Sequence, residues 1–122
     1  MKKSNYLFPI LFITSLCYSK PIDVFFGTGG RNAEGIYHAT FNPDNAKFTP
    51  AKLAAKIGSP GFLATHPNGK ILYSVGRWDE GSGALGYHIG KNGELTEFTR
   101  MICPDGGSAH IPVHPSGKFL LT

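Results

Sequence analysis

HPNGKIL at residues 66–72 returns as HPSGKFL at residues 114–120, an offset of 48 positions. The similarity extends upstream to Gly58 and its counterpart Gly106, so the offset relates more than a single turn. A period near 48 residues lies in the range of β-propeller blades, which contain four strands each. The repeated stretch therefore indicates a propeller.

Short apolar runs bounded by Gly, Pro or Asn predict strands around the repeated stretch. One full repeat contains four such runs, at residues 62–65, 71–75, 85–89 and 95–102. The preceding region contains three, at residues 22–28, 35–42 and 47–57. No segment shows a long helical period. We predict an all-β chain with about two to two and a half four-stranded antiparallel blades.

The first predicted blade lacks its innermost strand, and residues 109–122 begin a third blade that ends in its second strand. Two blades alone would expose a broad apolar face and unpaired strand edges. A seven-bladed ring at this period needs about 336 residues. We therefore expect the natural product to be longer than this chain.

The composition is that of a folded chain with many tight turns. It has 16 Gly and 9 Pro, and hydrophobic residues at 41% outweigh charged ones at 16%. Part of the formal net charge of +4 comes from Lys2 and Lys3 at the N-terminus, and Lys and Arg do not cluster elsewhere. The charge therefore gives no case for a nucleic-acid partner.

Residues 1–19 have the pattern of a secretory signal peptide. Lysines at 2–3 precede an apolar stretch over residues 6–16, and the small residues Cys17 and Ser19 suit cleavage after Ser19. The stretch is shorter than the roughly 20 apolar residues that span a membrane. We therefore expect an exported protein, periplasmic or extracellular, that leaves the membrane after cleavage.

The remaining residues, 20–122, are predicted to be the N-terminal part of the propeller domain. A lipid anchor on Cys17 is the weaker alternative to cleavage, because the bulky Leu16 precedes that cysteine. After cleavage Cys103 is the one cysteine left, so no disulfide can form within this piece.

Several stretches resemble the opening blades of the lactonase propellers of the 6-phosphogluconolactonase type, a family that also contains a carboxymuconate cyclase. They are VFFGT at 24–28, EGIY at 34–37, FNPD at 41–44, GSPGFLATHPNGKILY at 58–73 and GGSAH at 106–110. The resemblance covers residues 22–122. It implies a seven-bladed ring that hydrolyses a small-molecule lactone, of sugar type, and needs no cofactor.

His110 is the candidate catalytic residue. At the 48-residue offset its counterpart is Phe62, an apolar residue at the start of an inner strand. A histidine that replaces a core-type residue in one blade only suits a site in the central channel, and the lactonase family also carries a histidine at this motif. A histidine can act as a general base on water. The alternative is a core histidine bonded to a nearby carbonyl.

Arg77 and Glu80 are the candidate substrate-binding residues. The first strand of a blade begins, and the second ends, on the same rim, so Arg77 and His110 are expected to face one pocket. An arginine suits an anionic substrate group or a developing oxyanion. The family often has Asn-Glu where this chain has Gly76-Arg77, so a carboxylate would come from Asp79 or Glu80 in the following loop. The alternative is a set of solvated loop residues.

His66 and His114 recur in the repeat, which indicates a role in packing the turn. His110 and His114 are four residues apart on a strand, about 13 Å, so we predict no metal site. We expect the full-length protein to be a lactone hydrolase and this piece alone to be inactive. The alternatives are a non-catalytic exported propeller that binds a polymer or a protein through its rim, and a gene remnant that does not fold.

Overall fold

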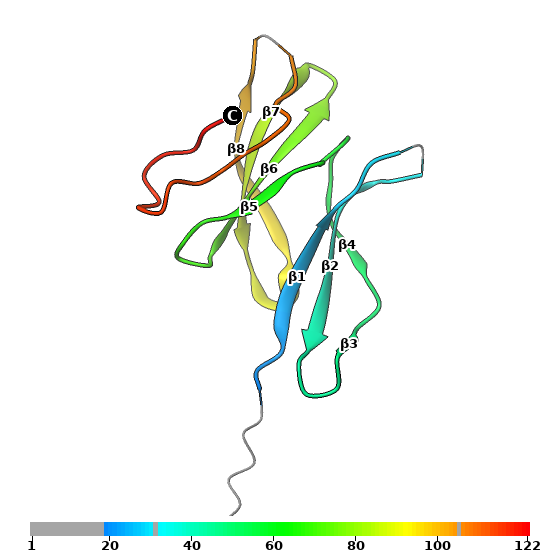
Figure 1. The fold of residues 1–122 in the computed structure, drawn as a ribbon. Helices are drawn as coiled ribbons and strands as arrows, with labels where there is room; N and C mark the ends of the chain where they lie inside the picture. Colours follow the sequence, from blue (N-terminus) through cyan, green and yellow to red (C-terminus); the bar gives the residue numbers. More distant parts are fainter. Residues whose placement is uncertain (1–18, 31, 105) are drawn as a thin grey trace, which may run out of the picture.

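The computed structural model describes residues 19–30, 32–104 and 106–122, and these form two antiparallel sheets side by side (Figure 1). The first sheet contains β1 (Ile22–Gly27), β2 (Gly35–Asn42), β3 (Lys47–Phe48) and β4 (Lys52–Lys56). The second contains β5 (Leu63–Thr65), β6 (Ile71–Trp78), β7 (Gly81–Ile89) and β8 (Leu95–Ile102), with a 3₁₀ turn, η1 (Lys91–Gly93), before β8. The prediction of four-stranded antiparallel blades is confirmed. The predicted signal peptide, except Ser19, lies outside the described residues.

The second sheet is a simple meander in the order β5-β6-β7-β8. Successive side chains of a strand point to opposite faces, and directly paired residues share a face. Leu72 therefore lies beside Tyr87 on one face, and Val75 beside Ala84 on the other. All four are buried, because another part of the chain covers each face.

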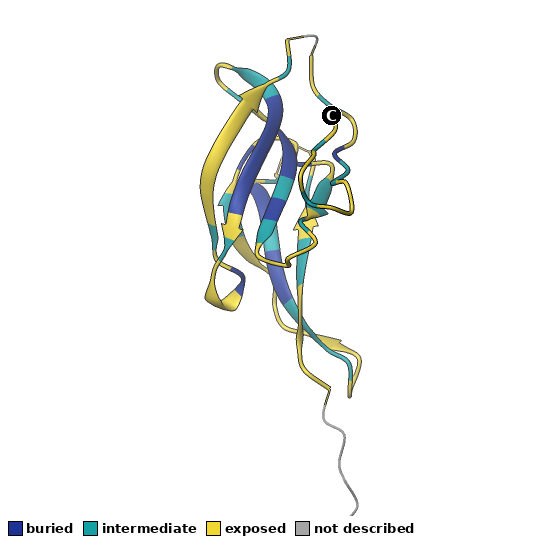
Figure 2. Cartoon of the chain, turned by 90° about the vertical axis from the view of Figure 1, so that its left-hand side faces the viewer, coloured by how far each residue is buried: buried dark blue, intermediate teal, exposed yellow. Residues whose placement is uncertain are grey.

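Two apolar clusters hold the sheets in place. The larger joins Ile36 of the first sheet to Leu72, Leu85 and Tyr87 of the second, and Ile57 fills the space between them. The smaller packs Val75 and Ala84 against Ile111, which lies in the segment after β8. Figure 2 shows the buried residues concentrated along the inner strands β2, β6 and β7, whereas β8 is almost wholly exposed. Each fully buried aliphatic side chain contributes roughly 1.5–3 kcal/mol to folding.

The β6–β7 hairpin is longer than predicted. β6 continues past Val75 to Trp78, and β7 begins at Gly81 rather than Leu85, so the predicted loop is a two-residue turn. The glycines that suggested a loop are strand residues, and close packing requires them. A Cβ at Gly83 would lie 2.0 Å from the carbonyl oxygen of Met101 on the neighbouring strand.

The outer strand of the first sheet is divided. Residues 47–57 were predicted as one strand, but β3 and β4 pair separately with β2. Pro50 lies between them and has no N–H to donate to the ladder. Thr49 stabilises the break, because its N–H donates to the Thr40 carbonyl and its Oγ1 accepts from the Thr40 N–H, both at 2.9 Å.

The two HP-x-G turns have the same internal hydrogen bonds and also contact each other. The His66 and His114 carbonyls accept from the N–H groups of Gly69 and Gly117, each at 2.8 Å. His66 Nε2 donates to the Gly117 carbonyl at 3.1 Å, and its Nδ1 accepts from the Asn68 N–H at 3.1 Å. Both repeated histidines thus form hydrogen bonds that hold their turns, which is the packing role that the repeat indicates.

Candidate functional site

Arg77 lies near the end of β6 with its backbone held on both sides. Its N–H donates to the Gly58 carbonyl at 2.7 Å, and its carbonyl accepts from the Gly58 N–H at 3.1 Å. On the other side it pairs directly with Ser82 of β7, so the two side chains share a face. The Arg77 side chain is exposed on a fixed backbone.

A recess opens beside this side chain, between the second sheet and the segment that follows β8. We call it the Arg77 recess. It has a volume of about 260 Å³, and its lining includes Ser59, Arg77, Ser82 and Gly107–Ala109. The polar groups come from three separate parts of the chain. Because its walls belong to two successive blades, their packing determines its shape.

His110 follows the lining residue Ala109 directly but is not itself part of the lining. Its ring is exposed and meets Phe62 edge to face, with ring centroids 5.2 Å apart and an interplanar angle of 85°. The next residue, Ile111, is 2% exposed and anchors the segment in the smaller apolar cluster. The segment that carries His110 therefore reaches the Arg77 recess through Gly107–Ala109. His110 itself does not line the recess, so its place with Arg77 in one pocket stays a prediction.

Glu80 lies at the tip of the β6–β7 hairpin, outside the Arg77 recess. The hydrogen bond to Glu97 raises the pKa of the Arg100 guanidinium, and the Glu80 charge adds a smaller effect. Arg100 also lies 4.9 Å from the ring centroid of Trp78, in a cation–π contact. The Glu80 charge thus interacts with Arg100 in the outer strand β8.

Sequence reasoning missed three polar residues of the recess, Ser59, Ser82 and Ser108. Ser108 Oγ lies 3.3 Å from Cys103 Sγ. This hydrogen bond, followed by one from Thr122, lowers the pKa of the Cys103 thiol. A serine carries no motif of its own here, and only the pairing of β6 with β7 places Ser82 beside Arg77.

Across residues 19–30, 32–104 and 106–122, no three His, Cys, Asp or Glu side chains gather closely enough to hold a metal ion. The same residues contain no helix of the length and apolarity that crossing a membrane requires.

The sequence profile of the family described as "Lactonase, 7-bladed beta-propeller" matches residues 18–122. A curated relative, the 6-phosphogluconolactonase of Bacillus subtilis (strain 168), is 36% identical over 91 residues. The aligned part covers 74% of this chain but 26% of that relative. The chain therefore spans about a quarter of the length of the curated relative that it matches.

Solved structures show the same fold. A Lactobacillus plantarum protein superposes with a TM-score of 0.70 at 23% identity, over 80% of this chain and 28% of that one. A Bacteroides fragilis protein, provisionally named as a 6-phosphogluconolactonase, superposes with a TM-score of 0.69 at 18% identity, over 78% of this chain and 27% of that one. At these identities the likeness concerns the fold alone.

Proposed function

The chain belongs to the lactonase family of seven-bladed β-propellers, and from this premise we propose that the protein that carries it hydrolyses a sugar-type lactone. The observation that carries the proposal is the recess lined by Arg77 and by Gly107–Ala109, the residues directly before His110. An imidazole can activate a water molecule and a guanidinium can stabilise an oxyanion, and both functions serve ester hydrolysis. The curated relative, a 6-phosphogluconolactonase, supports lactone hydrolysis as the class of reaction.

His110 is the general base of the proposed reaction, or the group that orients it. The imidazole takes a proton from a water molecule, and the water oxygen bonds to the lactone carbonyl carbon. The carbonyl oxygen becomes an oxyanion. When it re-forms the carbonyl, the ring C–O bond breaks, and the ring oxygen leaves with a proton as an alcohol. The product is an open-chain hydroxy acid, and no external oxidant or reductant is involved.

Arg77 stabilises the oxyanion, or an anionic group of the substrate, in this scheme. Its backbone is hydrogen-bonded to Gly58, so the guanidinium extends from a fixed point beside the recess. A preorganised cation of this kind lowers the barrier most where negative charge develops. Glu80 remains a proposed substrate-binding residue only for a ligand that extends over the hairpin tip, since it lies outside the recess.

We also propose that the protein is exported and acts on an unphosphorylated lactone. The support is the signal-like pattern of residues 1–19. Phosphorylated sugars are cytosolic, so an exported enzyme meets neutral lactones instead. Fractionation of the native host tests this part. The protein in the periplasm or medium, with an N-terminus at Lys20, supports export, whereas an intact N-terminus in the cytosol contradicts it.

The reaction is tested with the protein expressed from its complete gene. Acid release is followed in a pH-stat with gluconolactone, a simple aliphatic lactone and phosphorylated gluconolactone, each against its spontaneous hydrolysis. Faster release from gluconolactone supports the proposal, and a preference for the phosphorylated compound contradicts the substrate assignment. If no lactone is hydrolysed faster than in buffer, the second candidate, a non-catalytic binding propeller, is favoured. The arginine in place of the family's usual glutamate supports that candidate.

A further inference from the structure

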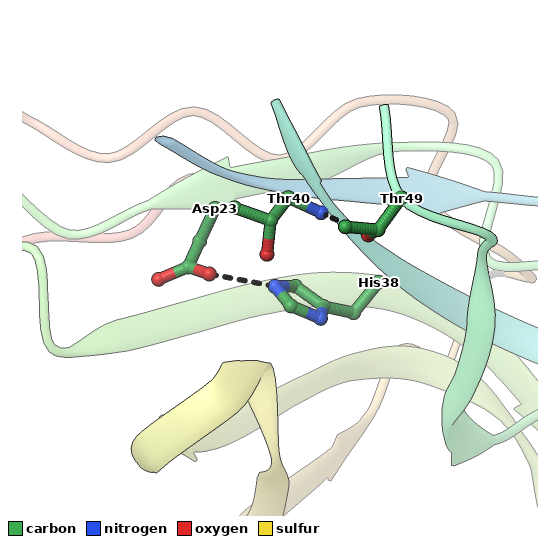
Figure 3. A network of polar contacts seen from close by, with 4 residues as sticks. All are labelled: Asp23, His38, Thr40 and Thr49. Carbon is green, nitrogen blue, oxygen red and sulfur yellow. Dashed lines mark hydrogen bonds and ion pairs between the residues drawn. The ribbon is translucent and has the colours of Figure 1, made fainter. Parts of the chain in front are cut away.

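A second polar site lies in the first sheet, around the pair formed by Asp23 and His38 (Figure 3). His38 Nε2 donates to Asp23 Oδ1 at 2.7 Å. The His38 side chain is 10% exposed, whereas the Asp23 side chain is 53% exposed. The pair therefore presents an open carboxylate that is held by a buried imidazole. Because Nε2 carries the donated proton, Nδ1 of a neutral His38 is an acceptor.

The His38 ring is held in place from both sheets. It packs against Phe25 with ring centroids 5.1 Å apart. On the other side it lies against Gly93 of η1, where an added Cβ would lie 2.2 Å from the ring. Figure 3 shows the turn directly beside the imidazole. Position 93 of the next blade therefore has room only for a glycine. The contacts with Phe25 and Gly93 hold the His38 ring without a ligand.

The pair does not recur in the second blade. At the 48-residue offset, Asp23 corresponds to Ile71 and His38 to Gly86, so the second blade has no such pair. A residue pattern that every blade needed for packing would recur, as the HP-x-G turn does. The pair is therefore not part of the pattern that these two blades share.

A hollow of about 740 Å³ surrounds the open side of the pair, and we call it the His38 hollow. Its polar lining consists of Asp23, His38, Thr40, Thr49, Lys52 and Asn92. The volume lies in the range of small-molecule sites. The lining holds one carboxylate, that of Asp23, and one ammonium, that of Lys52. The hollow therefore offers several hydrogen-bonding groups with charges of both signs.

We propose that the His38 hollow binds a neutral polyhydroxylated ligand of the size of one or two sugar units. Ligand hydroxyls donate to the Asp23 carboxylate, while Lys52 donates to ligand oxygens and the Asn92 amide both donates and accepts. Two observations carry this assignment, the preorganised Asp23–His38 pair and a polar lining with donors and acceptors of both charge signs. The hollow and the Arg77 recess lie at opposite ends of β7. The recess includes Ser82, near the start of the strand at Gly81, and the hollow includes Asn92, in the turn after its end at Ile89. The proposal is thus independent of the lactonase proposal.

The test is calorimetric titration of the complete protein with D-glucose, D-galactose, D-mannose and maltose. Sodium gluconate, titrated into R77A so that the proposed lactonase site does not bind it, and glucosamine serve as the anionic and cationic comparisons. We expect at least one neutral sugar to bind more tightly than either charged compound. If no neutral sugar gives heat above dilution, or if a charged compound binds better, the proposal is wrong.

Three variants locate the binding. Asn92 has φ 58°, so N92G removes the amide at a backbone position that suits glycine. D23N removes the carboxylate charge, and K52A removes the ammonium. Each should weaken sugar binding by about tenfold or more. K56A, in the same strand as Lys52 but outside the lining, is the matched control and should bind as the wild type does.

Unchanged sugar binding in both N92G and D23N would overturn the site, because binding would then lie elsewhere. Thermal unfolding of every variant confirms that the protein is folded. Lactone hydrolysis is measured in parallel and should be unchanged in N92G. A protein that binds sugar but hydrolyses no lactone would contradict only the proposed function, and the converse result would contradict only the His38 hollow.

Discussion

His110 and Phe62 hold equivalent positions in successive blades, and their rings meet edge to face with centroids 5.2 Å apart. The exchange of an aromatic ring for an imidazole at this position places a titratable group on the rim beside the Arg77 recess. Ile111, the next residue, anchors the segment in the smaller apolar cluster. A propeller can thus gain a chemical group in one blade while it keeps the blade architecture.

Replacing Arg77 tests the proposed stabilisation of negative charge. R77A should lower kcat/KM for the best lactone by about 10²–10³-fold, because the developing oxyanion loses its cation. R77K keeps the charge but loses the planar fork, and should retain an intermediate rate. Steady-state kinetics on purified full-length variants check both. Wild-type kcat/KM in R77A would remove Arg77 from the mechanism.

Gly83 should be among the most sensitive glycines of the fold. An alanine Cβ would meet the Met101 carbonyl at 2.0 Å, so the β7–β8 pairing has to shift. We expect G83A to lower the free energy of unfolding by about 1–3 kcal/mol or more. G29A is the matched control, because a Cβ at Gly29 meets no atom within 4 Å. Denaturant unfolding compares them, and equal stabilities would contradict the described strand pairing.

The hydrogen bond between the two HP-x-G turns should stabilise the packing of successive blades. H66A removes the donor to the Gly117 carbonyl and should cost about 1 kcal/mol, with a further loss from the ring's packing. His114 bonds within its own turn to Ser116, so H114A should have a smaller effect. Chemical unfolding of both variants measures the difference. A larger loss in H114A would be inconsistent with this contact.

Tyr87 should make the protein sensitive to alkali. Burial, followed by the nearby Glu97 charge, raises its pKa to about 12 from 10.0. The folded state then keeps the phenol proton that the unfolded state loses, so this contribution is complete below about pH 10 and is lost as the pH rises towards 12. The loss amounts to on the order of 2–3 kcal/mol.

Y87F should therefore unfold less readily than the wild type between pH 10 and 12. Its stability at pH 7 should be equal or slightly higher, because the Tyr87 hydroxyl is buried with no hydrogen-bond partner among the described residues. Urea unfolding at pH 7 and at pH 11 measures both effects. The same pH dependence in both proteins would show that Tyr87 is not responsible.

The blade architecture could be predicted because short sequence patterns, each within one blade, determine its strands and turns. The 48-residue offset, the HP-x-G turns and the short apolar runs predicted seven strands over residues 22–102. The structure has eight there, because the predicted strand 47–57 is divided at Pro50, and its β6–β7 hairpin is longer than predicted. That hairpin was misjudged because Gly76 and Gly83 look like loop residues. Their need for close contact with Ile57 and Met101 becomes apparent only in three dimensions.

The sites were less accessible to sequence reasoning for the same reason. His110 and Arg77 break the repeat or the family pattern, so the sequence alone was enough to propose them as site residues. Ser82 lies in the Arg77 recess only through its pairing with β6, and Asp23 meets His38 only because β1 and β2 are paired. Glu80 was expected from its place after the second strand, and the two-residue turn carries it outside the recess.

The central claim is that His110 promotes hydrolysis of a lactone. The most direct measurement is kcat for gluconolactone in full-length wild type, H110A and H88A, the last being an exposed histidine stacked on Phe98 of the outer strand. We predict that H110A lowers kcat by about 10²–10⁴-fold while H88A leaves it unchanged. Hydrolysis by H110A at the wild-type rate would contradict the assignment.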